Sequence, residues 1–506
     1  MTKHTKPKWV KDQLSQRHKL IKKLGQGGQG VVYQTSDPQL LVKMPLKNFE
    51  EITDPTEITH FQEQLERLFL LPLSESMHIT KPLYLLDGQA GYVMQMMQDM
   101  KPIGEWLPQI YKEQASDNSK QKDSGNLPPP PWLPDWISPE VPKASAYPLA
   151  MYAKSGGTKR RLELLTQATI ELLKLHSVGV IFMDISPENL FCSKTKGYNE
   201  VWLIDADNLR FEVTNAKAGV LTPQYAAPEV VKGESGARVT SDAYSLSLLA
   251  FKILTMCGAF EGERFTDDDD DWAADDSQNG ELSVETQAEH GLLPFIFDAE
   301  DDSNTQIRGR GLPHQLTLTP ELLTFFQEMF GIGRTQPWQR PSLHSLPRML
   351  AKATDNSIQC SCGMSFYYQP SLENNACPYC QKQPQNLLVA TSYQYSNDGI
   401  GEPIWTWVSP FSEDEDLKLP RRLAGSFEFD KHSVPLLEIS HIESDSFIYA
   451  SAEDVRIDIT DLSGRFTPLA NQWLLEKSQL EEGVQLYVHN PHSVLIEIKV
   501  LDNNAI

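Results

Sequence analysis

The sequence predicts an α+β protein with three folded segments, at about residues 1–352, 357–385 and 386–506. The first segment opens with a glycine-rich, strand-like stretch and continues with helical periodicity. The second gathers four of the six cysteines, and the third alternates apolar and polar residues as strands do. A chain of 506 residues also exceeds what one ordinary core organises, so we expect several domains.

The composition is that of a globular protein, because 40% of the residues are hydrophobic and 22% are charged. The formal net charge of −23 repels a phosphate backbone, so we expect no nucleic-acid partner. No apolar run approaches the roughly 20 residues that cross a bilayer, and the start, MTKHTKPKWVKDQ, lacks the apolar part of a signal peptide. We therefore expect a cytoplasmic protein without a membrane partner. Cys192 and Cys257 stand alone in apolar surroundings, and we expect them to be buried.

The first segment begins with an expected tail, residues 1–16, before the stretch HKLIKKLGQGGQGVVYQT. This stretch and the following LLVKMP predict a glycine-rich hairpin and a third strand. Helical periodicity follows at about residues 56–71, 160–176 and 242–255. We therefore expect one mixed domain over residues 17–352.

Two expected insertions interrupt this domain, at about residues 107–157 and 261–302. The first contains LPPPPWLPDWISPEVPKAS, whose prolines oppose regular structure, so we expect no core element there. The second is rich in acids, including the run from Asp267 to Asp271, and self-repulsion predicts a solvated loop. Recruitment of a basic substrate is the alternative role of this acidic stretch.

A cluster of glycines lies at the predicted hairpin. Gly25, Gly27 and Gly30 form a G-x-G-x-x-G pattern, and Val32 follows it. Positions without side chains allow backbone N–H groups to lie close over a polyphosphate, although such glycines also make plain turns. Lys43 stands on the next predicted strand, where its ammonium can reach phosphate oxygens or simply be solvated.

Two polar loops follow predicted helices and strands. In VIFMDISPENLF, the spacing of Asp184 and Asn189 is typical of a loop that offers a base and a metal-binding amide. In VWLIDADNLRF, Asp205 ends an apolar strand, where its carboxylate can hold Mg²⁺ between phosphates or cap a turn. Taken together with Lys43, these residues predict a nucleotide phosphate site.

The segments LTPQYAAPEVVKG, TSDAYSLSLLAF and QPWQRPSL follow in this order, and the whole set of motifs resembles eukaryotic-type Ser/Thr protein kinases. The resemblance implies a two-lobed protein kinase fold that uses ATP with Mg²⁺ or Mn²⁺. It also implies that Thr222 faces a protein substrate, that Glu229 pairs with Arg340, and that Asp242 supports the catalytic loop from beneath.

The same resemblance assigns roles around the nucleotide. Asp184 orients the attacking hydroxyl, and Asn189 and Asp205 bind the metal ion. A glutamate of the helix after Lys43 holds the lysine, and FQEQLERLFLL offers Glu63 and Glu66, of which we favour Glu66. The residues expected to border the adenine are Met94, Gln95 and Met97.

Within the kinases, the sequence is similar to a bacterial group encoded with tellurite-resistance-type stress genes. The similarity rests on LIDADN, TPQYAAPE, GLLPFIFDAEDDSN, MFGIGRTQPWQRP and the cysteine stretch, over about residues 21–385. It implies a role in bacterial stress or defence signalling. It further implies a metal-dependent phosphatase and a von Willebrand A-type protein as partners.

The chain departs from the usual HRDLKPEN and DFG motifs. Met183 replaces an arginine that pairs with a phosphorylated activation loop, so we expect little dependence on phosphorylation of Thr214. Ser186 replaces a lysine near the γ-phosphate, which predicts a low rate. Ala206 and Asp207 stand where DFG has Phe and Gly. These departures leave two other functions open, a nucleotide-binding pseudokinase scaffold and a small-molecule kinase.

A CxC pair and a CxxC pair lie within residues 357–385, formed by Cys360, Cys362, Cys377 and Cys380. Four thiolates in a reducing compartment are typical ligands of structural Zn²⁺, so we expect a zinc ribbon whose fold depends on the metal. The first pair is one residue shorter than the usual knuckle, and free or redox-active thiols are the alternative. Segments such as VQLYVH and VLIEIKV predict a β-rich, sandwich-like domain over residues 386–506 that binds a partner or substrate.

Overall fold

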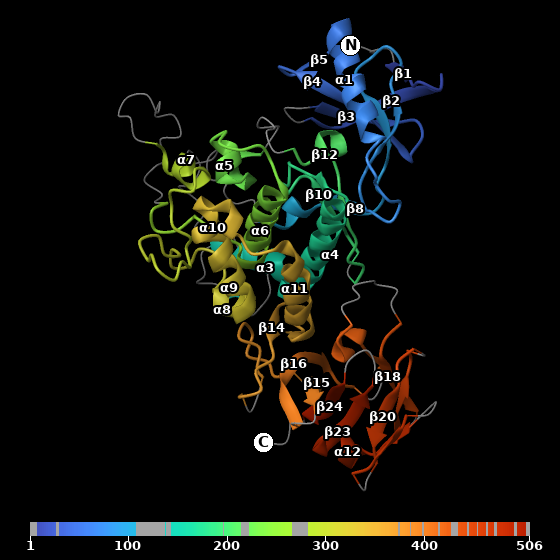
Figure 1. Cartoon of the computed structure of the whole chain (residues 1–506), viewed down its shortest axis with the longest axis vertical. Coiled ribbons are helices and arrows are strands. Elements are labelled where there is room, and N and C mark those ends of the chain that lie inside the picture. The colour runs from blue at the N-terminus through green and yellow to red at the C-terminus, as the bar shows by residue number, and fades with distance from the viewer. Residues whose placement is uncertain are drawn as a thin grey trace.

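The computed structural model describes residues 8–26, 30–107, 137, 143–195, 197–213, 222–265, 282–372, 375–384, 386–396, 399–412, 415–426, 434–442, 445–452, 454–461, 464–469, 473–489 and 493–501. Three bodies follow one another along the long axis: an N-terminal sheet with one helix, a helical body, and the C-terminal sheets (Figure 1). This mixture of helices and sheets agrees with the expected α+β class. No helix among the described residues is long and apolar enough to span a membrane.

The N-terminal sheet is antiparallel and has the order β1-β2-β3-β4-β7-β6, with β5 paired to β4. Its strands are β1 (Trp9–Lys11), β2 (Arg17–Gln26), β3 (Gly30–Thr35), β4 (Leu40–Lys47), β5 (Glu50–Glu51), β6 (Pro82–Leu85) and β7 (Tyr92–Gln95). Helix α1 (Pro55–Leu68) starts after Asp54, whose carboxylate accepts hydrogen bonds from the N–H groups of Thr56 and Glu57. The helix buries Leu65 and Leu68.

Strand β1 lies within the stretch 1–16 that we expected to be a tail. It pairs with the first residues of β2. The next residue, Asp12, is buried, accepts hydrogen bonds from the N–H groups of Leu14 and Gln16, and contacts His18 Nε2 at 2.9 Å. Because these contacts satisfy a buried carboxylate, the sheet begins at Trp9 and the described part of this stretch is not a tail.

The helical body is built around two helices, α4 and α6, that are buried over most of their length. Its helices are α3 (Lys143–Lys154), α4 (Gly157–Ser177), α5 (Pro228–Val231), α6 (Val239–Thr255), α7 (Val284–Glu289), α8 (His314–Thr317), α9 (Pro320–Phe330), α10 (Ile332–Thr335) and α11 (Leu346–Asp355). Its short strands are β8 (Met100–Pro102), β9 (Val180–Ile181), β10 (Leu190–Ser193), β11 (Val201–Leu203) and β12 (Arg210–Phe211). Its 3₁₀ turns are η1 (Ile103–Trp106), η2 (Ala206–Asn208), η3 (Pro223–Tyr225), η4 (Pro337–Gln339) and η5 (Leu343–Ser345). One core cluster joins α1, α4, α6 and α9.

Both expected insertions contribute to the core at their edges. Helix α3 lies within the stretch 107–157, and its Tyr152 and Ala153 are buried. Burial of these residues offsets the backbone hydrogen bond that Pro148 removes inside the helix. In the stretch 261–302, Phe295 and Ile296 belong to the main core cluster. The insertions are therefore narrower than expected, and the acidic run from 267 to 271 lies outside the described residues.

After α11 the chain forms a short hairpin and two antiparallel sheets. The hairpin consists of β13 (Ser357–Gln359) and β14 (Ser365–Tyr367). In the described residues, the sheets have the orders β16-β15-β24-β23-β20-β21 and β17-β18-β19-β22, and both contribute to one core cluster. Their elements are β15 (Leu387–Ser396), β16 (Gly399–Pro410), β17 (Leu417–Leu419), η6 (Arg421–Ala424), β18 (Leu437–Ile442), β19 (Asp445–Ala450), β20 (Ile457–Thr460), β21 (Phe466–Pro468), β22 (Trp473–Leu475), α12 (Lys477–Glu482), β23 (Val484–Val488) and β24 (Val494–Leu501).

The C-terminal sheets are attached to the helical body at the end of α11. The Asp355 carboxylate accepts hydrogen bonds from Arg422 at 2.8 and 2.9 Å and from Trp405 Nε1 at 2.8 Å. The β13–β14 hairpin is held by Lys159 of α4, whose N–H group donates to Ser365 Oγ at 2.7 Å. Hydrogen bonds therefore join the helical body both to the β13–β14 hairpin and to the C-terminal sheets.

Candidate active site

The loop between β9 and β10 carries Asp184 and Asn189. Both side chains are buried. The Asn189 amide nitrogen donates to the Asp184 carboxylate at 3.0 Å and to the Asp184 carbonyl at 2.9 Å. Because the nitrogen is committed to Asp184, the amide oxygen is the atom left to bind a cation. The structure thus brings these two predicted residues together.

Asp242 of α6 holds this loop from beneath, as the resemblance implied. Its carboxylate accepts hydrogen bonds from the N–H groups of Phe182 at 2.7 Å and Met183 at 2.9 Å, and it contacts His176 Nε2 at 3.1 Å. Met183 has a φ of 73°, a left-handed conformation that costs on the order of 1 kcal/mol outside glycine. The buried carboxylate of Asp242 stabilises the turn that requires this conformation.

Lys43 projects from β4 towards Asp205, which follows β11. Its Nζ forms ion pairs with Asp205 and, at 2.6 Å, with Asp207 Oδ2. Burial alone would lower the pKa of Lys43, but the carboxylates of Asp207 and Asp205 outweigh burial, so this pKa lies above its ordinary value. The Ile204 N–H group donates to the Asn189 carbonyl at 2.9 Å. Lys43 and Asp205 therefore share one site with the catalytic loop.

The donor set of this site suits a hard divalent cation. Asp205 offers carboxylate oxygens and Asn189 an amide oxygen, which are the ligands that Mg²⁺ and Mn²⁺ prefer. The Asp205 side chain is 24% exposed, so it is open to a ligand from one side. These two residues fit the magnesium ion that a nucleotide site requires.

Asp207 is a site residue whose role the sequence did not reveal. Its Oδ1 accepts a hydrogen bond from the Tyr92 hydroxyl, and its Oδ2 accepts one from Lys43. Burial raises the pKa of Asp207, and the attraction of Lys43 offsets only part of this effect, because the nearby negative charge of Asp205 raises the pKa as well. In the sequence, Asp207 stands only where the DFG motif has glycine. The signal that could have identified its role is a second acid two residues after Asp205, together with a lysine on a buried strand.

Glu66, which we expected to hold Lys43, lies on the exposed face of α1. Glu63 is exposed as well. The ion pairs of Lys43 in the described part of the chain are those with the two aspartates after β11. Because Leu65 and Leu68 face the core, helical geometry turns positions 63 and 66 away from it. The structure therefore does not bring Glu66 to Lys43.

Strands β2 and β3 form the glycine-rich hairpin. Gly25 pairs with Val32 across it, and Gly27 lies outside the described residues. A Cβ atom at Gly30 would lie 3.0 Å from the Met44 carbonyl oxygen and 3.3 Å from Lys43 Cε, whereas one at Gly25 would meet no atom within 4 Å. Close approach to strand β4 therefore explains Gly30 and not Gly25.

Three residues expected at the adenine lie at the end of β7 and just beyond it. Met94 faces Leu41 of β4 across the sheet, two positions from the pair formed by Tyr92 and Lys43. Met94 and Met97 are half-buried, and Gln95 is exposed. The contact of these residues with adenine stays a prediction.

The segment TPQYAAPE packs against the catalytic loop. The Thr222 hydroxyl donates a hydrogen bond to Asp184 Oδ1 at 2.7 Å. Glu229 accepts hydrogen bonds from Arg340 at 2.7 and 2.8 Å, the ion pair that the resemblance implied. Thr214 lies outside the described residues, so the expectation about its phosphorylation stays a prediction.

Four cysteine side chains converge beside the β13–β14 hairpin. All their Sγ atoms lie within 4.8 Å of one another, in Cys360, Cys362, Cys377 and Cys380. The N–H group of Gly363 donates to the Cys360 carbonyl, and that of Gln381 to the Cys377 carbonyl. Two tight turns therefore aim the thiols at one point, and the short first pair does not prevent convergence. The set fits a tetrahedral Zn²⁺.

The other two cysteines are buried, as expected. Burial raises the pKa of Cys192 to about 11 and that of Cys257 to about 12. A raised pKa disfavours the reactive thiolate. Both residues therefore act as small core side chains.

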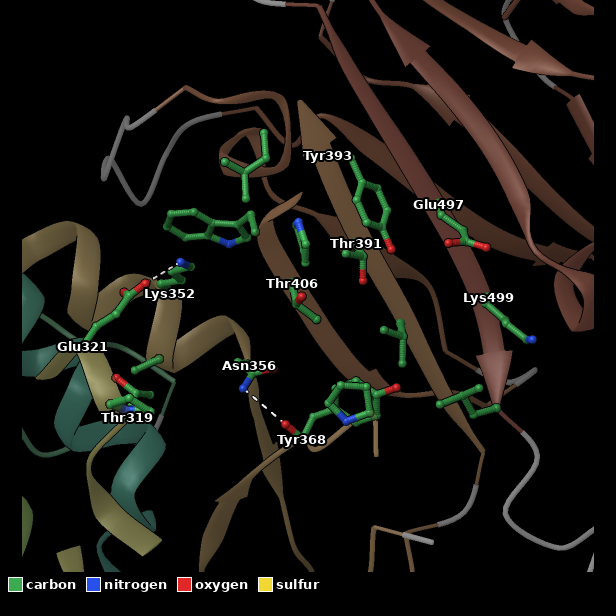
Figure 2. A pocket seen from close by; sticks show the side chains of 18 residues that line it. Thr319, Glu321, Lys352, Asn356, Tyr368, Thr391, Tyr393, Thr406, Glu497 and Lys499 are labelled. Atoms are coloured by element: carbon green, nitrogen blue, oxygen red, sulfur yellow. Dashed lines mark hydrogen bonds and ion pairs between the residues drawn. The ribbon is translucent and has the colours of Figure 1, made fainter. Parts of the chain in front are cut away.

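A cavity of about 620 Å³ lies between the helical body and the C-terminal sheets (Figure 2). Glu321 and Lys352 line its helical side and form an ion pair at 2.6 Å. Tyr393, Glu497 and Lys499 line its sheet side. The cavity is separate from the candidate active site, because its lining includes none of Lys43, Asp184, Asn189, Asp205 and Asp207, the residues of the expected phosphate site.

Comparison with known proteins identifies a known domain family within the helical body. Residues 151–346 match the protein kinase domain family. The chain is 32% identical over 110 residues to the serine/threonine-protein kinase pkn2 of Myxococcus xanthus, covering 20% of this chain and 13% of that protein. It is 32% identical over 111 residues to PknB of Mycobacterium tuberculosis, covering 21% and 17%. It is 24% identical over 267 residues to PknD of Chlamydia felis, covering 49% and 25%. The chain thus spans a quarter or less of the length of these relatives.

Proposed function

We propose, from the protein kinase domain that the chain contains, that the protein transfers the γ-phosphate of ATP to Ser or Thr hydroxyls of a protein substrate. One observation carries this proposal. The Asp184 carboxylate contacts Asn189 through one oxygen and the Thr222 hydroxyl through the other. A base that contacts both a metal-binding amide and the segment that presents the substrate is placed to accept the proton of an attacking hydroxyl.

The neighbours of Asp184 would bind the nucleotide phosphates and the metal ion. Lys43 would neutralise oxygens of the nucleotide phosphates, and Asn189 and Asp205 would hold Mg²⁺. When bound, Mg²⁺ supplies charge neutralisation between phosphate groups. The Thr222 hydrogen bond limits the rotation of the Asp184 carboxylate, which favours one orientation of the attacking hydroxyl.

Two departures in the catalytic loop bear on the rate and on its control. Ser186 is buried at the position where a lysine is usual, so one positive charge near the γ-phosphate is missing. Met183 cannot pair with a phosphate group, which is the reason to expect activity without phosphorylation of the activation loop.

A nucleotide-binding pseudokinase scaffold is the alternative function. It is favoured by the ion pair that Asp205 already makes with Lys43, because a nucleotide with its metal ion must compete with this contact. The test is transfer of labelled γ-phosphate to casein or to the chain itself, together with binding of ATP and Mg²⁺.

We expect Asp184→Asn to reduce transfer by a factor of about 10² to 10⁴ while nucleotide binding persists. Asp87→Asn, which changes an exposed aspartate of the N-terminal part, is the matched control. Binding without transfer in the unchanged protein would establish the pseudokinase, and a protein that ignores ATP with millimolar Mg²⁺ would refute both functions.

A small-molecule kinase is the second alternative. The hydrogen bond of Thr222 to Asp184 and the buried pair of Glu229 with Arg340 hold a segment against the loop that suits peptide presentation. Phosphorylation of sugars or aminoglycosides but not of casein or the chain itself would favour the small-molecule class.

We also propose that the four converging cysteines bind one structural Zn²⁺ in a zinc ribbon. The geometry of two facing turns supports this proposal. Elemental analysis of the purified protein should find one zinc per chain. Free thiols would instead leave the protein without stoichiometric metal and sensitive to mild oxidants.

For the cell, we propose a cytoplasmic role in bacterial stress or defence signalling, with a metal-dependent phosphatase and a von Willebrand A-type protein as partners. The C-terminal sheets, which are sandwich-like, would bind a partner or the substrate. Phosphoproteomics of cells that carry the active chain or its Asp184→Asn form would identify the substrate. Sites that differ between the two and are reversed by the phosphatase would support this role.

A further inference from the structure

Helix α1 supplies no carboxylate to Lys43. The apolar side chains Leu65 and Leu68 occupy its inward face, and Glu63 and Glu66 are exposed. The contact that α1 makes with the turn after β11 is neutral, since Gln64 Nε2 lies 3.5 Å from the main-chain oxygen of Asp207. The charge that holds the lysine must therefore come from another element.

The turn η2 supplies that charge. Asp207 Oδ2 lies 2.6 Å from Lys43 Nζ, and Asp207 Oδ1 accepts a hydrogen bond from the Tyr92 hydroxyl. Tyr92 and Lys43 face each other on β7 and β4. Both oxygens of one carboxylate are thus engaged by two neighbouring residues of the N-terminal sheet. The Asp207 side chain is only 14% exposed and that of Lys43 only 8% exposed, so solvent competes little for this contact.

Asp205, the other partner of Lys43, has a second task. A carboxylate that binds Mg²⁺ has its charge committed to the metal and gives less to an ammonium. Asp207 points to Lys43 and Tyr92, and its position in the site leaves it as the carboxylate available to the lysine when the nucleotide and metal are bound.

We propose that Asp207 is the positioning residue of Lys43, in place of a glutamate of helix α1. This inference rests on the proposed function, because it assigns to Lys43 the nucleotide phosphates. Asp207 fixes the ammonium at the end of a flexible side chain and Tyr92 fixes Asp207. The acidic residue at this position is then part of the nucleotide site.

The experiment compares four variants of the full chain, Asp207→Asn, Asp207→Glu, Asp207→Gly and Glu66→Gln. For each we would measure the dissociation constant for ATP with Mg²⁺ by calorimetry, kcat and KM for transfer to casein, and the thermal unfolding midpoint. A hydrogen bond to a charged group is worth enough to change binding by a factor of about 10 to 100. We expect Asp207→Asn and Asp207→Gly to weaken nucleotide binding and to raise KM by that factor, and Asp207→Glu to recover part of the loss.

Asp207→Gly is the sharpest variant because it installs the glycine that the DFG motif carries. If Glu66 held Lys43, this change would leave nucleotide affinity intact or improve it, and Glu66→Gln would weaken it. That pair of results would overturn the proposal. A higher Mg²⁺ requirement in Asp207→Asn, with unchanged affinity at saturating Mg²⁺, would make Asp207 a metal ligand and would overturn it as well.

One further variant, Tyr92→Phe, keeps the test decisive. If the Asp207 variants unfold, Tyr92→Phe removes one contact of the carboxylate and should weaken nucleotide binding by a factor of about 3, within the range of a neutral hydrogen bond. Unchanged affinity in a folded Tyr92→Phe protein would count against the proposal. If no form transfers phosphate, the kinase function fails, while the binding constants still test Asp207 independently.

Discussion

The phosphate site and the cysteine module both gather side chains suited to binding ions, but they draw these side chains from different distances. Lys43 and Asp205, which form an ion pair, are 162 residues apart in the sequence. Cys360 and Cys380, whose Sγ atoms lie 3.5 Å apart, are separated by 20 residues. The first site joins the N-terminal sheet to the helical body, whereas the second is made by two turns beside one hairpin.

The cysteine module depends on local turns, whereas the phosphate site depends on the packing of separate parts of the molecule. Two turns within one short stretch bring the cysteines together, so binding of the proposed metal ion would be coupled to folding of the module. The catalytic loop is fixed by α6 through Asp242, whereas Lys43 is positioned by the packing of a separate sheet. A change in the packing of the N-terminal sheet can therefore displace Lys43 while the catalytic loop with Asp184 and Asn189 stays in place.

The largest expected effect is in the cysteine module. Cys377 is fully buried, and structural zinc contributes about 10 to 16 kcal/mol of apparent binding energy to small modules. We expect Cys377→Ser to lose the metal and to lose hydrogen-exchange protection over residues 357–382, with α6 unaffected. Elemental analysis and exchange mass spectrometry measure this. Cys257→Ser is the control, and full metal content in Cys377→Ser would contradict the expected zinc site.

The second prediction concerns the buried ion pair of Arg340 with Glu229, which holds the segment TPQYAAPE beside the catalytic loop. Removing one partner leaves a buried charge alone, which costs about 3 to 5 kcal/mol. Arg340→Ala should therefore lower the free energy of unfolding by this amount in urea titrations. Lys352→Ala is the matched control, because it breaks a largely exposed pair with Glu321 that is worth about 1 kcal/mol or less. Equal losses of unfolding free energy in the two variants would contradict a stabilising role of the buried pair.

The attachment of the C-terminal sheets, which follow the cysteine module, is tested at Arg422. Its two hydrogen bonds to Asp355 join the C-terminal sheets to α11, and bonds to a charged group contribute about 1.5 to 3 kcal/mol. Arg422→Met should loosen the sheets, so that limited proteolysis after residue 386 becomes faster. Binding of ATP should stay unchanged. Weakened nucleotide binding would show that the junction communicates with the phosphate site.

The smallest expected effect concerns pH and the pair of Glu261 with Lys252. Burial would raise the pKa of Glu261, but the attraction of Lys252 outweighs it, so this pKa lies below its ordinary value. A depressed pKa gives stability that is present above the unfolded value of about 4.3 and is lost as the pH falls through the folded pKa. Glu261→Gln should be less stable than the unchanged protein at pH 7. Urea titrations should show this gap narrowing below pH 4, and a constant gap would contradict the assignment.

Much of the helical body could be predicted from local patterns. The periodicity at 160–176 and 242–255 matches α4 and α6, because apolar residues at helical spacing must face one core. The catalytic loop and the cysteine turns were also predictable, since their members are close in sequence. Helix α3 could not be predicted, because the prolines before Lys143 favour irregular structure. The helix is stabilised by the burial of Tyr152, a tertiary contact that local helix propensity does not reflect.

The sequence by itself determined the polar groups of the phosphate site, the order of its motifs and the convergence of the four cysteines. Only the tertiary structure decided which carboxylate meets Lys43. Glu66 and Asp207 are both acids at reachable positions, and the difference between them depends on how α1 is rotated about its axis. That rotation is set by the burial of Leu65 and Leu68 against residues far away in the sequence, a balance of packing energies that no local pattern records.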